Sequence, residues 1–416
     1  MKVAIIGSGI SGLTCAYLLQ QVADIQVFES APNIGGHTAT KDVVLDGKNY
    51  AIDTGFIVFN DWTYPNFIRL MDELGVKSKP TEMSFSVTSE LSGLEYSGSS
   101  LNTLFAQRRN IFKLSFYGML RDIVRFNREA VEDLDAGLVS EKTSLGDYLA
   151  LRGYKTEFIE NYLIPMGSAI WSASHETMMS FPLVFFIRFF KNHGLLSVTN
   201  RPQWRVIEGG SRAYLEPLTR SFSDRITTSA HIVSVERDEN AARLTFDDGR
   251  EETFDQVVFA CHSDQALALL KTPTNAEQQV LSAMAYQEND VVLHTDRSLL
   301  PKRTLAWASW NYRIRQQQQE RAVLTYNMNI LQGVESEPTF CVTLNDTDNI
   351  DPTAILGRYQ YSHPVFTLDS VAASQRWSEI NGQCKTWFCG AYWANGFHED
   401  GCSSGIRVAK ALGAQW

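Results

Sequence analysis

The first residues that could do chemistry are three glycines with the spacing Gly-x-Gly-x-x-Gly: Gly7, Gly9 and Gly12. The first permits a tight turn, the second lets the backbone approach a pyrophosphate, and the third lets a helix pack closely on a strand. Glu29 follows at the end of an apolar run, where it can accept hydrogen bonds from an adenosine ribose. The phosphates would lie at a helix N-terminus, where free N–H groups and the dipole favour anions. The pattern predicts a dinucleotide site.

A second glycine pair, Gly35 and Gly36, follows Glu29 by only six residues. NAD domains do not usually need this pair, whereas FAD proteins commonly carry it as a second backbone approach to the cofactor. An ordinary turn is the alternative, because Gly-Gly is common in turns. Beside the first motif, the pair favours FAD.

A third motif runs from Gly390 to Gly401, far along the chain. A strand, a glycine turn and a helix start would form a second site for an anion or a carbonyl. In two-domain flavoproteins such an element brings a helix N-terminus to the flavin ring. His398, Glu399 and Asp400 resemble a metal or acid–base cluster, but three adjacent residues cannot all point at one centre. No metal site is therefore expected.

These motifs must be positioned by regular elements. Residues 2–6 and 25–28 read as buried strands around a helix at 13–21, which is a βαβ opening. Further expected elements are helices at 61–75, 101–135 and 403–412, β-rich segments at 204–235 and 243–260 with a hairpin turn at 247–250, strands at 287–297, 338–345 and 386–390, and a polar loop or helix end at 316–319.

The bulk composition is that of an ordinary globular protein. The chain has 416 residues, which favours two domains, and 44% of them are hydrophobic. The net charge of −10 argues against a nucleic-acid partner. Six cysteines without a Cys-x-x-Cys pair indicate reduced structural thiols. No apolar run reaches the roughly 18 residues of a membrane span, and a strand begins at once, so a cytoplasmic location is expected.

Several stretches together resemble one family. They are residues 35–38, 53–60, 63–66, 170–172, 201–204 and 396–401. The sequence resembles the amine-oxidase-like FAD-dependent oxidoreductases, in the clade that is similar to the N-terminal flavoprotein half of plant cyclopropane fatty acid synthases. The likeness runs nearly from end to end.

The resemblance implies an α/β fold (α+β overall) of the amine oxidase/glutathione reductase type. A Rossmann-like FAD-binding domain would comprise 1–80, 200–265 and 380–416, and a discontinuous substrate domain 81–199 and 266–379. FAD would be non-covalent, because neither Cys389 nor Cys402 matches the family's flavin-linking position. The implied FAD contacts are Gly7, Gly9, Ser11, Gly12, Glu29, Gly35, Gly36, His37, Gly55, Phe56, Val233, Gly390, His398, Glu399 and Asp400.

The sequence departs from typical amine oxidases at three places. An arginine usually follows the glycine pair, and here it is His37. An acidic residue usually follows the glycine of the C-terminal strand, and here it is Ala391. The usual central lysine is missing, and the matching strand carries Asn289, Asp290 and His294. These departures leave flavin binding intact and speak against amine oxidation.

Two segments bear on the substrate. Residues 107–128 hold six basic residues against one acid, Asp122, among apolar side chains, so they form either a membrane-surface helix or a solvated face packed on the core. Residues 181–190 contain five phenylalanines and either line an acyl tunnel or form a buried element. Both features fit a lipid better than a small amine.

No catalytic residue is assigned, and the candidates are His294, His363 and His398. His175 could also face a substrate cavity, although a structural role is an alternative for each histidine. His193, His231 and His262 are interpreted as structural.

The leading hypothesis is dehydrogenation of a fatty acyl chain, branched, methylated or unsaturated, by hydride transfer to FAD. The alternatives are a flavin-containing amine oxidase and a flavin-bearing partner of a fatty acyl methyltransferase. Peripheral contact with the inner membrane face accompanies the leading hypothesis.

Overall fold

The computed structural model describes residues 1–197, 199–316 and 320–416. The N-terminal sheet contains five described strands in the order β10-β2-β1-β14-β20, all parallel. The strands are β1 (Lys2–Ile6), β2 (Asp24–Phe28), β10 (Ile226–Thr227), β14 (Gln256–Phe259) and β20 (Thr386–Phe388). Apolar side chains of β1 are fully buried, as in a parallel sheet covered on both faces. The predicted βαβ opening is confirmed.

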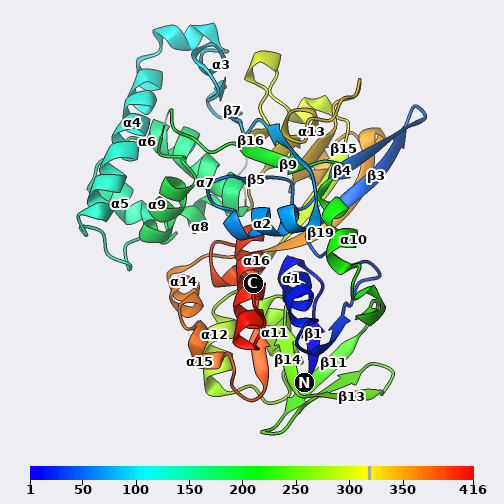
Figure 1. Cartoon of the computed structure of the whole chain (residues 1–416). Coiled ribbons are helices and arrows are strands. Elements are labelled where there is room, and N and C mark those ends of the chain that lie inside the picture. Colours follow the sequence, from blue (N-terminus) through cyan, green and yellow to red (C-terminus); the bar gives the residue numbers. More distant parts are fainter. Residues whose placement is uncertain (198, 317–319) are drawn as a thin grey trace.

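Two helices from opposite ends of the chain pack side by side on this sheet (Figure 1). They are α1 (Ile10–Leu19) and α16 (His398–Ala411). A Cβ atom on Gly405 would lie 2.3 Å from the carbonyl oxygen of Ser11, so only glycine permits this close approach. Helix α16 begins five residues before the predicted start at 403, because its first turn is polar and lacks the apolar periodicity used to predict it.

A small antiparallel sheet of β11 (Ile232–Arg237), β12 (Ala242–Phe246) and β13 (Glu251–Phe254) borders the parallel sheet. The predicted hairpin turn at 247–250 joins β12 to β13. The segment 204–235, expected to be β-rich, contains β9 (Trp204–Ile207), β10 and the start of β11, but helical turns separate them. After β9, the chain forms the 3-10 turn η3 (Ser211–Tyr214) and α10 (Leu215–Thr219), which bury Tyr214 and Leu218 at helical spacing.

A second, mixed sheet contains seven described strands in the order β19-β15-β18-β17-β16-β7-β8. The predicted strands at 287–297 and 338–345 correspond to β15 (Tyr286–His294) and β18 (Cys341–Leu344). The other members are β7 (Phe85–Ser89), β8 (Glu95–Ser97), β16 (Trp310–Ile314), β17 (Leu324–Asn327) and β19 (Ile355–Pro364). The prediction for 316–319 falls mostly on 317–319, outside the described residues.

Helices gather beside this second sheet, at the left of Figure 1. They are α3 (Leu101–Leu104), the 3-10 turn η1 (Arg108–Phe112), α4 (Leu114–Asp135), α5 (Leu145–Leu151), α6 (Thr156–Phe158), the π-turn η2 (Ile159–Leu163), α7 (Ile164–Trp171), α8 (His175–Met179) and α9 (Leu183–Asn192). The phenylalanine-rich segment is thus helical, and Phe181, Phe186 and Phe190 are buried in the core of this cluster.

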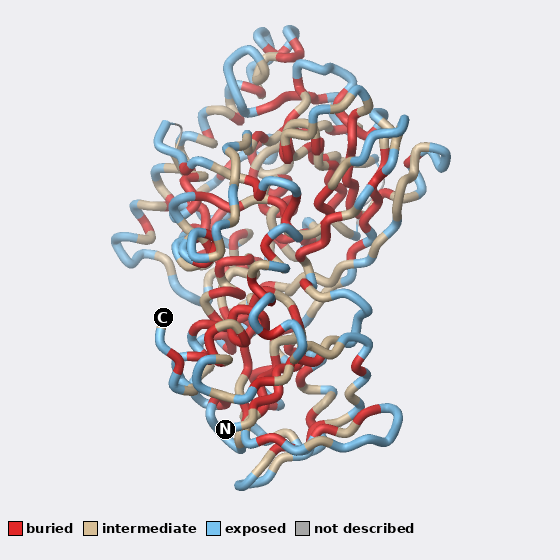
Figure 2. The backbone as a smooth tube through the Cα atoms, turned by 45° about the vertical axis from the view of Figure 1, so that its right-hand side comes forward, coloured by how far each residue is buried: buried red, intermediate tan, exposed pale blue. Residues whose placement is uncertain are grey.

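The buried residues form an almost continuous interior (Figure 2). The remaining strands and α-helices are short. They are β3 (Thr40–Leu45), β4 (Lys48–Asp53), β5 (Phe59–Asn60), α2 (Pro65–Leu74), β6 (Ser78–Thr81), α11 (Ser263–Leu269), α12 (Asn275–Ser282), α13 (Met328–Leu331), α14 (Leu368–Ser374) and α15 (Trp377–Ile380). Helix α2 ends before a left-handed Gly75, as predicted.

The fold class expected from the sequence is confirmed. We keep the division into a dinucleotide domain (1–80, 200–265, 380–416) and a substrate domain as a proposal, which the membership of the two sheets supports. Among the described residues, no helix is both long enough and apolar enough to cross a bilayer.

Candidate active site

One cavity of about 1380 Å³ connects the parallel sheet with the helical cluster. It begins at Gly7 and Glu29, passes His37 and His363, and reaches Met166 on α7. Pockets for small ligands usually have about 300–1000 Å³. The cavity therefore has room for a large cofactor together with a second molecule.

The dinucleotide end is built by the turn between β1 and α1. Gly9 is the N-cap of α1, and an added Cβ there would meet no described atom within 4 Å, because the position faces the cavity. The described part of the chain supplies no side-chain cap to α1 and no acid in its first turn, so its N–H groups can receive an anion. Gly36 approaches closely, since its Cβ would lie 3.1 Å from Gly9 Cα. These features fit a pyrophosphate.

Glu29 is held at the carboxyl end of β2. Its Oε2 accepts hydrogen bonds from the N–H of Ser8 at 2.9 Å and from the Ser8 hydroxyl at 2.6 Å, and its Oε1 accepts from the Ala31 N–H at 2.9 Å. The carboxylate lines the cavity with lone pairs left for a ribose.

Most of the predicted cofactor residues line this cavity. They are Gly7, Gly9, Ser11, Glu29, Gly36, His37, Gly55, Phe56, Val233, Gly390 and His398. Gly12 instead permits packing, because its Cβ would lie 2.0 Å from the Gly7 carbonyl oxygen, and Gly35 packs on Leu215.

Glu399 and Asp400 lie outside the cavity, and both carboxylates serve the fold. Glu399 accepts hydrogen bonds from the N–H groups of Asn66 at 3.2 Å and Phe67 at 2.8 Å, which are orphan donors in the first turn of α2. Asp400 accepts from the N–H groups of Asn395 and Phe397. Of the predicted triplet, only His398 lines the cavity.

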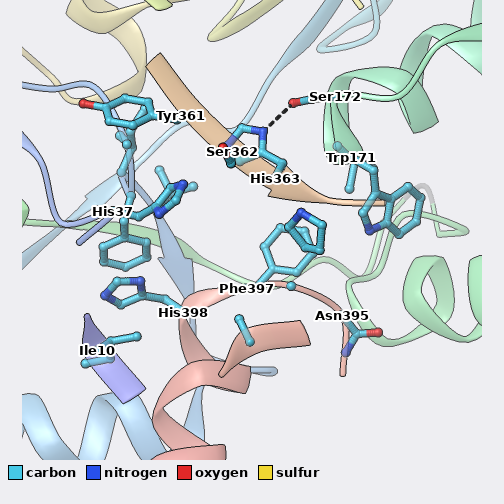
Figure 3. Close-up of a pocket in the computed structure, with 18 of the residues that line it drawn as sticks. Ile10, His37, Trp171, Ser172, Tyr361, Ser362, His363, Asn395, Phe397 and His398 are labelled. Atoms are coloured by element: carbon cyan, nitrogen blue, oxygen red, sulfur yellow. Dashed lines mark hydrogen bonds between the residues drawn. The ribbon is translucent and has the colours of Figure 1, made fainter. Parts of the chain in front are cut away.

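Histidines gather at the middle of the cavity (Figure 3). The ring centroid of His37 lies 5.6 Å from that of His363 and 6.2 Å from that of His262. Burial lowers the pKa of His37 to about 3 and that of His363 to about 4, with the neighbouring imidazoles adding to both shifts. These rings are therefore neutral at pH 7.

Two of the central histidines, His363 and His398, are oriented by partners from other elements. His363 Nδ1 lies 3.0 Å from the Ser172 hydroxyl, which follows α7. His398 Nε2 lies 2.8 Å from the Tyr214 hydroxyl, and its ring stacks on Phe56 with a centroid separation of 3.6 Å. Among the described residues, His37 Nε2 is buried without a hydrogen-bond partner, so it is available to a cofactor.

His294 does not belong to this group. It is fully buried outside the cavity, where Nε2 lies 2.7 Å from the Thr343 hydroxyl and Nδ1 accepts from the Asp296 N–H. His175 is exposed and pairs with Glu160.

His262 and His193, interpreted from the sequence as structural, do line the cavity. The position of His262 could have been predicted from the sequence. It follows strand β14 at the carboxyl end of a parallel sheet, where ligands bind.

The far end of the cavity is an apolar arm. We use this name for the part lined by Leu104, Leu120, Ile123, Met166, Ile170, Trp171, Phe189 and Leu195. Its polar members include Asn127, Ser172 and Arg201. In Figure 3, Trp171 lies on the opposite side of His363 from His37 and Ile10, so this arm continues beyond the histidines.

Fold and cavity together define a dinucleotide-dependent enzyme with a second, apolar binding region. The flavin containing amine oxidoreductase family matches residues 10–338, and the chain belongs to this family. It is an FAD-dependent oxidoreductase, and the cradle of Gly9, Gly36 and Glu29 fits that cofactor.

Solved structures with the same fold carry different chemistries. Putrescine oxidase bound to putrescine is 16% identical with a TM-score of 0.69, and covers 99% of both chains. Cyclohexylamine oxidase from Brevibacterium oxydans is 15% identical with a TM-score of 0.68, and a CLA-producing fatty acid isomerase from P. acnes is 14% identical with a TM-score of 0.70; both matches cover 99% of this chain and 98% of the other. No curated protein sequence matches the chain. At these identities the likeness concerns the fold.

Proposed function

We propose that this protein dehydrogenates a fatty acyl chain, branched, methylated or unsaturated, with FAD as the acceptor of the hydride. The observation that carries this proposal is the apolar arm. Each buried CH₂ group contributes about 0.8 kcal/mol, so an arm of this kind binds an alkyl chain without specific polar contacts.

The residues at the centre suit an uncharged substrate. Ser172 orients His363, and the unprotonated nitrogen of its neutral imidazole can accept the proton that the substrate releases in dehydrogenation. Trp171 and Phe189 exclude water on the apolar side. Bound FAD supplies a two-electron acceptor.

An ammonium group finds little to bind in the same cavity. Of the described residues that line it, only Glu29 and Glu82 are acidic, and Glu29 lies at the dinucleotide end. The lysine that is usual in amine oxidases is missing, and strand β15, where it is expected, carries the buried Asn289. This difference also speaks against an amine substrate. The fold of a fatty acid isomerase and the resemblance to the flavoprotein half of plant cyclopropane fatty acid synthases agree with an acyl substrate.

Amine oxidation is the second candidate, because the family match and the folds of two amine oxidases favour it. Aromatic rings near His37, among them Tyr361 at 5.4 Å, could surround a small amine. The third candidate function is that of a partner protein of a fatty acyl methyltransferase, in which the flavin has a structural role.

Anaerobic titration of the holoenzyme separates the three. Oleate and a methyl-branched long-chain acid, each dispersed in detergent, form one arm, and putrescine and cyclohexylamine the other. We expect only the acyl compounds to bleach the flavin absorbance, and Leu120→Gln in the apolar arm to weaken that response about tenfold. Leu151→Gln, at an exposed leucine, is the matched control. Bleaching by amines alone overturns the proposal, and bleaching by neither class favours the structural flavin.

A further inference from the structure

An exposed apolar tip projects where the chain passes from α3 through η1 to the start of α4. We define the tip as residues 101–117. Phe112 and Leu114 are each 87% exposed and Leu101 is 77% exposed, with Ile111 and Tyr117 also exposed. Large side chains exposed next to one another mark an interaction site more often than scattered single ones do.

The charge of this region is opposite to that of the whole molecule. Arg108, Arg109, Lys113 and Arg121 lie between 101 and 121, a stretch that contains no acid, while the chain carries −10. In the described part of the chain, the side chains of Arg108 and Arg109 hydrogen-bond only to neutral groups, the oxygens of Asn102, Phe105 and Gly93. Within the described residues, Arg108, Arg109 and Lys113 have no carboxylate partner at ion-pair distance. Their charge therefore faces solvent uncompensated.

The tip is continuous with the apolar arm. Leu104 on α3 and Leu120 on α4 line the cavity from the inner side of the same segments. Gly98 and Ser99 also line the cavity and are exposed, immediately before Leu101. The tip therefore borders a place where the arm reaches the surface, at the end of the molecule opposite β1 (Figure 1).

We infer that the tip docks on the surface of an anionic bilayer and sets the mouth of the apolar arm against the lipid. Phe112 and Leu114 would enter the acyl boundary, and the basic residues would contact anionic headgroups. This inference rests on the proposed acyl substrate and adds the route by which that substrate arrives. A second copy of this chain fits less well, because it would bring the uncompensated charges of Arg108, Arg109 and Lys113 against the same three charges.

The docking surface differs from the basic segment expected from the sequence. Arg125 is engaged by Glu129 at 3.0 Å and lies beside Asp122, and Arg128 lies 4.0 Å from Glu132. These arginines belong to an ion-paired helix face. Arg121 is likewise paired with Asp122 at 3.3 Å, so docking falls on the tip at 101–117 rather than on the whole of 107–128.

The test is flotation of the holoenzyme with vesicles of phosphatidylglycerol and phosphatidylcholine, against phosphatidylcholine alone. We expect binding to the anionic vesicles only, and loss of most of it when salt rises from about 0.1 M to about 1 M. Phe112→Ser with Leu114→Ser weakens binding at least about tenfold, and Arg109→Gln with Lys113→Gln does so on anionic vesicles.

Two matched control variants test whether the effects are specific to the tip. Leu138→Ser with Leu151→Ser removes two other exposed leucines, and Lys48→Gln with Lys410→Gln removes two other exposed charges. Both bind like the wild type. Because all these side chains are exposed, retained FAD and an unchanged Tm confirm that each variant is folded.

The inference is overturned if the wild type ignores anionic vesicles, if the tip variants bind as well as the controls, or if sedimentation shows a dimer that the serine variant abolishes. Bleaching by detergent-dispersed acyl substrate is measured in parallel. Bleaching without vesicle binding removes the docking surface and leaves the acyl function standing. Vesicle binding without bleaching overturns the acyl function and leaves the docking surface standing.

Discussion

Gly9 and Gly12 occur in one motif but serve different purposes. A side chain on Gly9 enters the cavity, whereas a side chain on Gly12 collides with the Gly7 carbonyl oxygen. We expect Gly9→Glu to fold with a normal far-UV circular dichroism spectrum and to lose the flavin absorbance. Gly12→Ala, in contrast, lowers the Tm or the soluble yield. A Gly9→Glu protein that keeps a full complement of FAD would place the phosphate site elsewhere.

His294 makes stability depend on pH. Burial lowers its pKa from 6.5 to about 4, so the unfolded chain binds this proton more readily than the folded one. The contribution is fully present above pH 6.5 and is lost as pH falls toward 4. The native protein therefore loses about 2 kcal/mol from this group between pH 7 and pH 5. We expect His294→Gln to show a smaller fall in Tm over that interval. His231→Gln, which removes an exposed imidazole, is the control, and equal slopes in both variants would contradict the assignment.

Among the elements, α2 depends on a residue distant in sequence. Tyr64, its N-cap, offers no side-chain hydrogen bond in the described structure, and Glu399 of α16 accepts from the first turn instead. Glu399→Ala leaves those donors unpaired and costs about 1–3 kcal/mol. We expect a lower Tm with unchanged FAD stoichiometry, measured by thermal denaturation and absorbance. Glu216→Ala, at an exposed ion pair, leaves the Tm unchanged. If Glu399→Ala loses FAD but keeps its Tm, the Glu399 carboxylate contacts the cofactor and this assignment is wrong.

Local signals predicted some elements and not others. The βαβ opening and the hairpin turn at 247–250 were readable because glycines and apolar runs define them locally. Helix α10 was missed within an expected β-rich region. Strand β19 was not predicted because none of its residues is fully buried. Glu399 was expected at the flavin because the family resemblance implies that the turn from His398 to Asp400 contacts the cofactor. Which of two neighbouring side chains faces a cavity depends on helix phase, and the start of α16 was predicted five residues late.

At the scale of the molecule, the glycine-lined end of the cavity could be predicted from the sequence, and the apolar arm could not. The first is built from one contiguous motif and its neighbours. The second combines α3, α4, α7 and α9 with the turn at Ser172, and no pairwise spacing in the sequence shows that these segments meet.

The same long-range assembly predicts the effect of a truncation. Strand β20 pairs with β14, and α16 covers α1, so removal of residues 380–416 exposes an edge strand and the apolar face of α1. We expect the shortened chain to aggregate or to lose FAD, as measured by soluble yield and absorbance. Adding the missing segment as a separate peptide is the control, and recovery of soluble, yellow protein would confirm the cause. A soluble truncated chain that holds FAD by itself would refute this account of the fold.

The pairing of α1 with α16 also has a consequence for protein synthesis. Thr14 and Cys402, which meet between these helices, are 388 positions apart. A ribosome adding roughly 5–20 residues per second needs roughly 20 to 80 seconds to make that stretch. Throughout this interval the apolar face of α1 in the nascent chain is not covered by α16, although the glycine turn at residues 7–12 has already been synthesised. Yield in a host cell should therefore respond to chaperone supply and translation speed more than to flavin supply.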